Sequence, residues 1–260
     1  MTLLPLIKIT PTPFPEVNAI LGLVLANTQE VLGAHFKGMY LFGSLASGDF
    51  SPHSSDIDYV VVTGDNLPAE LLIQLEAMHA EIAACGMAWA DKLEGFYFSL
   101  PVLRRYDPDQ LFPSIGVDWD FRMGGQGSEG IIQRYNLREQ GIVLAGPPLD
   151  DLIDPVTSDQ IRQATYELLI EWWVPMLENP THLASSEYQA YAVLTMCRML
   201  YTLNTGKIVS KPSAARWTLE NHPRWSALIQ HALTWQHGME MDCMVEVQDL
   251  IRYTFDTCHR

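Results

Sequence analysis

The stretch from Met39 to Thr63 constrains the fold of this chain more than any other. It reads MYLFGSLASGDFSPHSSDIDYVVVT: an apolar run, a Gly43-Ser44 break, a short helical segment, a loop and a second run over Ile57–Val62. That second run is β-branched and aromatic, which is typical of a buried strand. Two such strands joined through a turn and a helix predict an α/β domain built around a sheet.

Two aspartates stand at the start of the second predicted strand. Side chains alternate along a strand, so Asp56 and Asp58 are expected to project from the same face. Carboxylates held that close repel each other unless a cation lies between them, and Mg²⁺ suits such a site because its other positions accept water and phosphate oxygens. Gly43 lets the backbone approach a ligand, and Ser44 opens a helix with free N–H groups.

Together these residues predict the transfer of a nucleotidyl group from a nucleoside triphosphate. Either motif alone is common in solvated turns and loops, and only their combination between two apolar strands carries the hypothesis.

Composition narrows the class of partner. The chain has 260 residues and a formal net charge of −15. An acidic surface repels polynucleotide backbones and tolerates a small cationic or hydroxylated acceptor, so we expect no nucleic-acid partner. The alternative is that the charge only keeps the protein soluble.

The start of the chain and its cysteines bear on its location. The first residues, MTLLPLIKITPTPF, lack the basic-then-apolar order of a secretory signal, and no uninterrupted apolar run has the length of a membrane span. The four cysteines are scattered without metal-ligand spacing, which favours reduced thiols. We expect a cytoplasmic protein with no membrane partner.

The segments around the central stretch predict further elements of the same domain. Helices are expected over 15–32 and 67–84, followed by extended structure over 87–100. Glu94 lies inside the last run, which otherwise looks buried. It is interpreted as a third carboxylate of the cluster, either a metal ligand or the base that deprotonates a hydroxyl. The alternative is an edge-strand glutamate facing solvent.

Residues 107–130 are rich in Gly, Asp and Pro, and we expect an irregular loop there. Trp119 lies between two aspartates in it and would suit a platform for a cationic, sugar-like ligand. The alternative is a surface loop whose tryptophan packs at the domain junction.

The remaining sequence predicts a change of architecture. A helix over 131–141 and a strand over 142–145 precede Gly146-Pro147-Pro148, after which strands cease. Ser158 and Ser186 are expected to cap helices, the second with a capping box to Gln189. Helices are also expected over 213–221, 225–235 and 239–257. The fold class is therefore an α/β domain with a mixed sheet flanked by helices, residues 1–155, followed by an all-α helical bundle, residues 156–260.

Two basic residues stand out because the chain has only 16 Lys and Arg. Lys207 follows a predicted helix end and Arg198 lies earlier in the same helix; either could neutralise triphosphate charge. Alternatively, a lysine at a helix C-terminus complements the helix dipole and needs no ligand.

Several segments of the sequence resemble the motifs of a known family. YLFGSLASGDFSPHSSDIDYVVV resembles the core motif of the polymerase-β-like nucleotidyltransferases in their small-molecule branch. LREQGIVLAGPPL, the following DPV, and VLTMCRMLYTLNTGKIVSKPSAARW resemble the aminoglycoside adenylyltransferases that modify streptomycin and spectinomycin. The resemblance extends from about residue 30 to 237 and is most specific in the C-terminal block.

This resemblance implies a nucleotidyltransferase domain and a helical domain that bind ATP, Mg²⁺ and the drug. It implies that Asp56 and Asp58 hold Mg²⁺, Ser44 binds triphosphate, Glu94 is the catalytic base and Lys207 contacts ATP. The expected reaction transfers AMP from ATP to a hydroxyl of an aminoglycoside-like acceptor.

The sequence departs from the family where streptomycin-modifying members carry acidic residues early in one helix. Here Glu187 is the only acidic residue of that segment. Glu187 and Trp119 are candidate substrate contacts, and the departures leave the identity of the acceptor open. A different metabolite or protein acceptor, or a non-catalytic nucleotide-binding module, are the alternative functions.

Overall fold

The computed structural model describes residues 2–52, 55–116 and 120–258, and its chain divides into two compact units. The first comprises residues 1–126 and 133–155; the second comprises residues 127–132 and 156–260. The division at residue 155 coincides with the expected domain boundary, whereas residues 127–132 group with the helical unit instead of the α/β unit.

The first unit is built on a six-stranded mixed sheet in the order β5-β4-β3-β2-β1-β6. Strands β2 and β3 run parallel, and every other neighbouring pair is antiparallel. The strands are β1 (Phe36–Leu41), β2 (Ile57–Thr63), β3 (Leu93–Ser99), β4 (Phe112–Ile115), β5 (Phe121–Gly124) and β6 (Ile142–Ala145). The expected mixed sheet flanked by helices is thereby confirmed.

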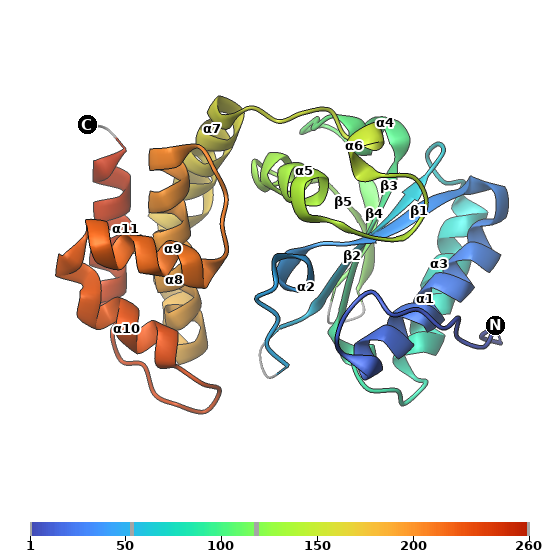
Figure 1. Cartoon of the computed structure of the whole chain (residues 1–260), viewed down its shortest axis with the longest axis horizontal. Coiled ribbons are helices and arrows are strands. Elements are labelled where there is room, and N and C mark those ends of the chain that lie inside the picture. The colour runs from blue at the N-terminus through green and yellow to red at the C-terminus, as the bar shows by residue number, and fades with distance from the viewer. Residues whose placement is uncertain (1, 53–54, 117–119, 259–260) are drawn as a thin grey trace. The chain divides into compact units, whose positions relative to one another are not determined.

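Helices cover both faces of this sheet (Figure 1). They are α1 (Pro15–Leu32), α2 (Gly43–Ser47), α3 (Ala69–Ala83), α4 (Leu100–Arg104), α5 (Glu129–Gln140) and α6 (Leu149–Leu152). One apolar core joins α1 and α3 to the side chains of one sheet face, and a second core joins α4, α5 and α6 to the other face.

Helix α1 starts at Pro15 and ends at Leu32, and its C-cap Gly33 has a positive φ of 50°, as is common for a glycine that follows a helix. Among the described residues, Pro15–His35 is the one segment long and apolar enough to cross a membrane, and 72% of that window is buried within the protein. Packing against the sheet accounts for this apolar composition.

Two expectations for the first unit were wrong. Residues 87–92 are not extended: a 3₁₀ turn over Ala90–Lys92 precedes β3. Segment 107–130 is not irregular throughout, because β4 and β5 form an antiparallel pair at the sheet edge. Each of these strands has four residues, and Pro113 and Gly124 mask the strand pattern.

The second unit is helical, as expected. Its helices are α7 (Ser158–Leu168), α8 (Ser186–Thr205), α9 (Lys211–Asn221), α10 (Ser226–Thr234) and α11 (Met244–Thr257). A π-helical turn, η3 (Leu169–Trp173), continues α7, and two 3₁₀ turns, η4 (Val174–Leu177) and η5 (Thr181–Ala184), follow it. Apolar side chains from α8 to α11 form one core together with Leu169 and Trp173.

Both predicted helix caps lie one residue earlier than expected. Thr157, not Ser158, caps α7 and forms a capping box with Gln160. Ser185, not Ser186, caps α8 by accepting from the backbone N–H of Tyr188. Where two hydroxyl residues are adjacent, the sequence does not distinguish which one adopts the extended cap conformation.

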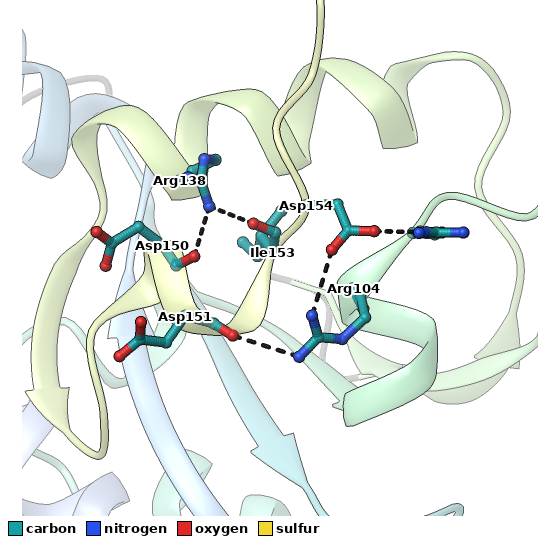
Figure 2. Close-up of polar contacts among 7 residues, drawn as sticks. Arg104, Arg138, Asp150, Asp151, Ile153 and Asp154 are labelled. Carbon is teal, nitrogen blue, oxygen red and sulfur yellow. Dashed lines mark hydrogen bonds and ion pairs between the residues drawn. The ribbon is translucent and has the colours of Figure 1, made fainter.

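Arginines fix the last residues of the first unit (Figure 2). Arg104 Nη1 and Arg105 Nε contact the carboxylate of Asp154 at 3.2 and 2.5 Å. Arg138 donates to the carbonyl oxygens of Asp150, at 2.7 Å, and Ile153. Hydrogen bonding by Arg105 is the main cause of a lowered pKa at Asp154. The chain therefore leaves the first unit from an anchored position.

Candidate active site

The turn between β1 and α2 lies directly against Asp58. Gly43 has a φ of 63°, and a Cβ on it would lie 2.0 Å from Asp58 Oδ2. The backbone N–H of Phe42 donates to the carbonyl oxygen of Asp58 at 3.2 Å, which holds the turn against the start of β2. Only glycine satisfies both the positive φ and the close approach.

The Ser44 hydroxyl follows this turn. It is buried and has no hydrogen-bond partner among the described residues. Buried hydroxyl groups in folded proteins are normally paired, so an orphaned one calls for a partner such as a ligand oxygen. The turn and the hydroxyl together make a polar cradle beside a carboxylate.

Asp58 and Glu94 occupy the same register position on the parallel strands β2 and β3. Neighbouring strands lie about 4.8 Å apart, so two acidic side chains start from adjacent backbone positions on one face. Further along the same face, Val60, Val62 and Phe98 belong to the second apolar core. The face thus changes from apolar to acidic where both strands begin.

Asp56 differs from the sequence expectation. It precedes β2, which starts at Ile57, and its Oδ1 lies 3.6 Å from Lys92 Nζ. Among the described residues, no three His, Cys, Asp or Glu side chains come together closely enough to hold a metal ion. The roles of Asp56, Asp58 and Glu94 toward a metal ion stay predictions.

The two predicted basic contacts belong to the second unit. Arg198 on α8 lines a pocket of about 380 Å³. Lys207 is exposed and follows Gly206, whose φ of 67° ends α8, and its backbone N–H donates to Thr205 Oγ1 at 3.2 Å. Their roles toward a nucleotide stay predictions.

The structure describes one of the two candidate substrate residues, Glu187. Glu187 is exposed in the first turn of α8 and does not line the pocket. Trp119 lies outside the described residues. Both assignments stay predictions.

The sequence analysis missed several residues that line the pocket, chiefly Trp172, Trp173, Tyr191 and Thr195. A helix continued from Ser158 at α-helical spacing would place Trp172 on an apolar face with Ile161 and Leu168, yet Trp172 is 48% exposed. The reason is η3: a π-helical turn changes the angular spacing of side chains, so a face drawn at α-helical period no longer applies. The one available signal was the spacing of Tyr191, Thr195 and Arg198, which repeats every three to four residues along α8.

Family comparisons match both parts of the chain. Residues 30–87 match the family model described as a nucleotidyltransferase domain. Residues 151–259 match the model described as the C-terminal domain of aminoglycoside adenylyltransferase. Each model matches less than half of the chain, and together they show that one part is similar to nucleotidyltransferase domains and the other to the C-terminal domain of aminoglycoside adenylyltransferases. The family resemblance seen in the motifs is confirmed.

Individual relatives agree with this composition. The Escherichia coli aminoglycoside (3'') (9) adenylyltransferase is 33% identical over 113 residues, which cover 43% of this chain and 40% of that protein. The spectinomycin 9-adenylyltransferase of Enterococcus faecalis is 25% identical over 218 residues, covering 75% of this chain and 78% of that protein. The match to the first relative thus spans well under half of its length.

A solved structure shares the fold. The spectinomycin adenyltransferase AAD(9) from Enterococcus, crystallised with ATP and spectinomycin, matches with a TM-score of 0.69 at 20% identity. The match covers 91% of this chain and 97% of that one. The fold class expected from the sequence is therefore confirmed over both units.

Proposed function

We propose that this chain transfers AMP from ATP to a hydroxyl group of an aminoglycoside-like acceptor and releases pyrophosphate. The observation that carries the proposal is the Gly43 turn seated against Asp58, with Glu94 at the adjacent register position. The family matches support adenylyl transfer as the reaction, because the relatives are named as aminoglycoside and spectinomycin adenylyltransferases.

In the proposed reaction the acceptor oxygen attacks the α-phosphorus of ATP. A new P–O bond forms, the bond between the α-phosphorus and its bridging oxygen breaks, and pyrophosphate departs. Glu94 takes the proton of the acceptor hydroxyl as general base. The Gly43 turn and the Ser44 hydroxyl bind phosphate oxygens, while Arg198 and Lys207 neutralise charge on the triphosphate.

Asp56 and Asp58 are the residues proposed to hold Mg²⁺. Their oxygen donors suit this ion, which needs one or two carboxylates in addition to water and phosphate oxygens. The orphaned hydroxyl of Ser44, next to the Gly43 turn that lies against Asp58, fits a phosphate oxygen brought beside it. When bound, the ion supplies Lewis-acid stabilisation of charge on the phosphoryl oxygens.

The proposed partners and location follow from charge and cysteine state. The net charge of −15 favours a small cationic acceptor over a polynucleotide. Cys85, Cys197, Cys243 and Cys258 are all free, as expected for a protein of the reducing cytoplasm, where we place it.

Pyrophosphate release tests the proposal. The full chain is incubated with ATP, Mg²⁺ and a panel of aminoglycosides, and release above the acceptor-free rate is expected with at least one of them. Asp58→Asn should fold but lose transfer, whereas the matched control Asp65→Asn, in an exposed turn, should behave as wild type. ATP binding without release, or release only with a protein acceptor, would contradict the proposal.

A further inference from the structure

Trp89 is the one residue other than glycine with a positive φ, 69°, in the part of the chain that the structure describes. Bulky side chains rarely adopt this left-handed conformation because it is strained, and such strain is concentrated at functional sites. Trp89 immediately precedes the 3₁₀ turn Ala90–Lys92, which leads into β3 and Glu94. The strained backbone therefore lies in the segment that leads to the candidate active site.

Hydrogen bonds and burial keep the chain in this conformation. The backbone N–H of Ala90 donates to the carbonyl oxygen of Met87 at 3.3 Å, and that of Lys92 donates to the carbonyl oxygen of Trp89 at 3.1 Å. The side chain of Ala90 is buried, so the turn is fixed to the core. Glycine would make the same bend without strain, so a tryptophan at this position indicates a use for its side chain.

The indole of Trp89 contacts the loop that carries Asp56. Its ring centroid lies 5.2 Å from that of Phe50, which in turn lies 4.8 Å from that of Phe14, the residue before helix α1. All three rings are partly buried and pack against the core that joins α1 and α3 to the sheet. Phe50, which follows helix α2 along the chain, is thus held between two other segments of the unit.

The remainder of this loop connects Phe50 with Asp56. The backbone N–H of Ser51 donates to Ser55 Oγ at 3.0 Å, and that of Ser55 donates to the carbonyl oxygen of Ser51 at 2.9 Å. These two bonds join the residue after Phe50 to the residue before Asp56. Because Asp56 precedes β2, its position depends on this loop and not on strand pairing.

A second contact with Asp56 starts from the same turn. Lys92 ends the turn, and its Nζ lies 3.6 Å from Asp56 Oδ1. Both side chains are well exposed, and exposed ion pairs contribute little to stability. The ammonium group does, however, place a positive charge beside a carboxylate that is proposed to hold a metal ion.

We propose that Trp89 is a positioning residue for the metal ion of the proposed transferase. Its ring, through Phe50, holds the loop that places Asp56. Its backbone turn places Lys92 so that the ammonium group balances the charge of Asp56 until the ion binds. The inference rests on the proposed function for the role of Asp56 as a Mg²⁺ ligand, and it adds the residues that determine where this ligand lies.

The two parts of the turn act on metal affinity in opposite directions. Loss of the Trp89 ring frees the loop, so Asp56 has to be ordered when the ion binds and the affinity falls. Loss of the Lys92 ammonium removes a like charge that competes with the ion, so the affinity rises. A turn that contributed only to folding would raise the affinity in neither variant.

Nucleotide binding measures the metal contribution without catalysis. Calorimetry on the full chain uses an ATP analogue with a methylene group between the α- and β-phosphorus, which cannot release pyrophosphate. The analogue is titrated once with Mg²⁺ and once with EDTA, and the ratio of the two affinities is compared between variants. Wild type is expected to bind the analogue more tightly with Mg²⁺. General losses of nucleotide affinity cancel in this ratio.

Trp89→Gly relieves the backbone strain but removes the ring, and it should lower the ratio about 10-fold. Phe50→Leu should lower it in the same direction, whereas Trp89→Phe, which keeps an aromatic ring, should stay within about three-fold of wild type. Lys92→Met should raise the ratio about three-fold. Lys8→Met, at an exposed lysine of the N-terminal segment, is the matched control and should leave it unchanged.

The outcomes separate this proposal from the transferase. Thermal unfolding first shows which variants are folded at the temperature of the titration, and Phe50→Leu and Lys92→Met decide the matter if Trp89→Gly is not. An unchanged ratio in the ring variants, or a lowered one in Lys92→Met, would overturn the positioning role even where pyrophosphate release supports the transferase. The expected ratios without pyrophosphate release from ATP with any acceptor would support the positioning role and refute the transferase.

Discussion

Glu94 and Asp58 start from adjacent backbone positions, yet the proposed reaction gives them different roles. Glu94 is the general base, whereas Asp58 holds Mg²⁺. Glu94→Gln keeps the shape and removes the basic oxygen. We expect kcat to fall by about two to four orders of magnitude, the usual scale for a general base, with ATP affinity unchanged. The measurement is steady-state kinetics paired with ATP calorimetry, and Glu70→Gln, exposed in the first turn of α3, is the control. A kcat within about three-fold of wild type would remove Glu94 from the mechanism.

Gly43 allows a test that separates backbone strain from crowding of the site. Gly43 and Gly48 flank α2 with φ values of 63° and 78°, but a Cβ at Gly48 has nothing within 4 Å, whereas one at Gly43 would lie 2.0 Å from Asp58 Oδ2. Alanine at either position costs about 1–2 kcal/mol of strain. Thermal unfolding should show a loss of stability in both variants, whereas transfer activity should fall sharply only in Gly43→Ala. Equal activities would show that the turn does not crowd Asp58.

The sequence indicated which residue types belong to the candidate site better than it indicated which side chains contact each other. The shared register position of Asp58 and Glu94 follows from the parallel pairing of β2 and β3. The contact of Asp56 with Lys92 depends on a 3₁₀ turn ahead of β3 and on the start of β2 at Ile57. Element boundaries decide such contacts, and they are the least determined part of a sequence pattern.

At the element scale, α3 packs on the sheet through a buried histidine. His79 is 1% exposed, and its Nε2 lies 2.6 Å from the Tyr97 hydroxyl on β3. Desolvation by burial lowers the pKa of His79 to about 3. Because the pKa of an unfolded histidine is about 6.5, the unfolded chain binds an extra proton between these values, and stability is lost as the pH falls through this range.

The resulting prediction concerns acid sensitivity. Between pH 7 and pH 5 this histidine should reduce the free energy of unfolding by about 2 kcal/mol, and His79→Gln should flatten that part of the curve while lowering stability at pH 7. Urea unfolding followed across this range measures both effects. An unchanged slope in the variant would show that His79 is not the group responsible.

The elements that the sequence missed share a physical cause. Helices α1 and α8 are long and periodic, so their limits follow from apolar spacing and terminal glycines. Strands β4 and β5 have four residues each and lie at the sheet edge, where pairing with a neighbour outweighs local propensity. The π-helical turn η3 has no comparable sequence signature, and for that reason the exposure of Trp172 was not predicted.

At the scale of the whole molecule, the division near residue 155 follows from the end of strand-helix alternation and the Gly146-Pro147-Pro148 segment. The assignment of residues 127–132 to the helical unit does not follow from any pattern in the sequence. It accompanies the contacts of buried Ser128 with Glu167 and Glu171, which join positions about forty residues apart in sequence. Long-range polar contacts of this kind leave no periodic pattern.

The net charge of −15 gives the prediction that belongs to the entire chain. A negative field attracts a cationic acceptor and repels ATP, and both effects weaken as the screening length shortens from about 10 Å at 0.1 M salt to about 3 Å at 1 M. Over this range the KM of a cationic aminoglycoside should rise several-fold, while the KM of ATP at fixed free Mg²⁺ should stay constant or fall. The two trends are measured in one set of initial rates, so each controls for the other. A parallel rise of both KM values would indicate a general effect of salt on the enzyme, because a single field cannot act with the same sign on ligands of opposite charge.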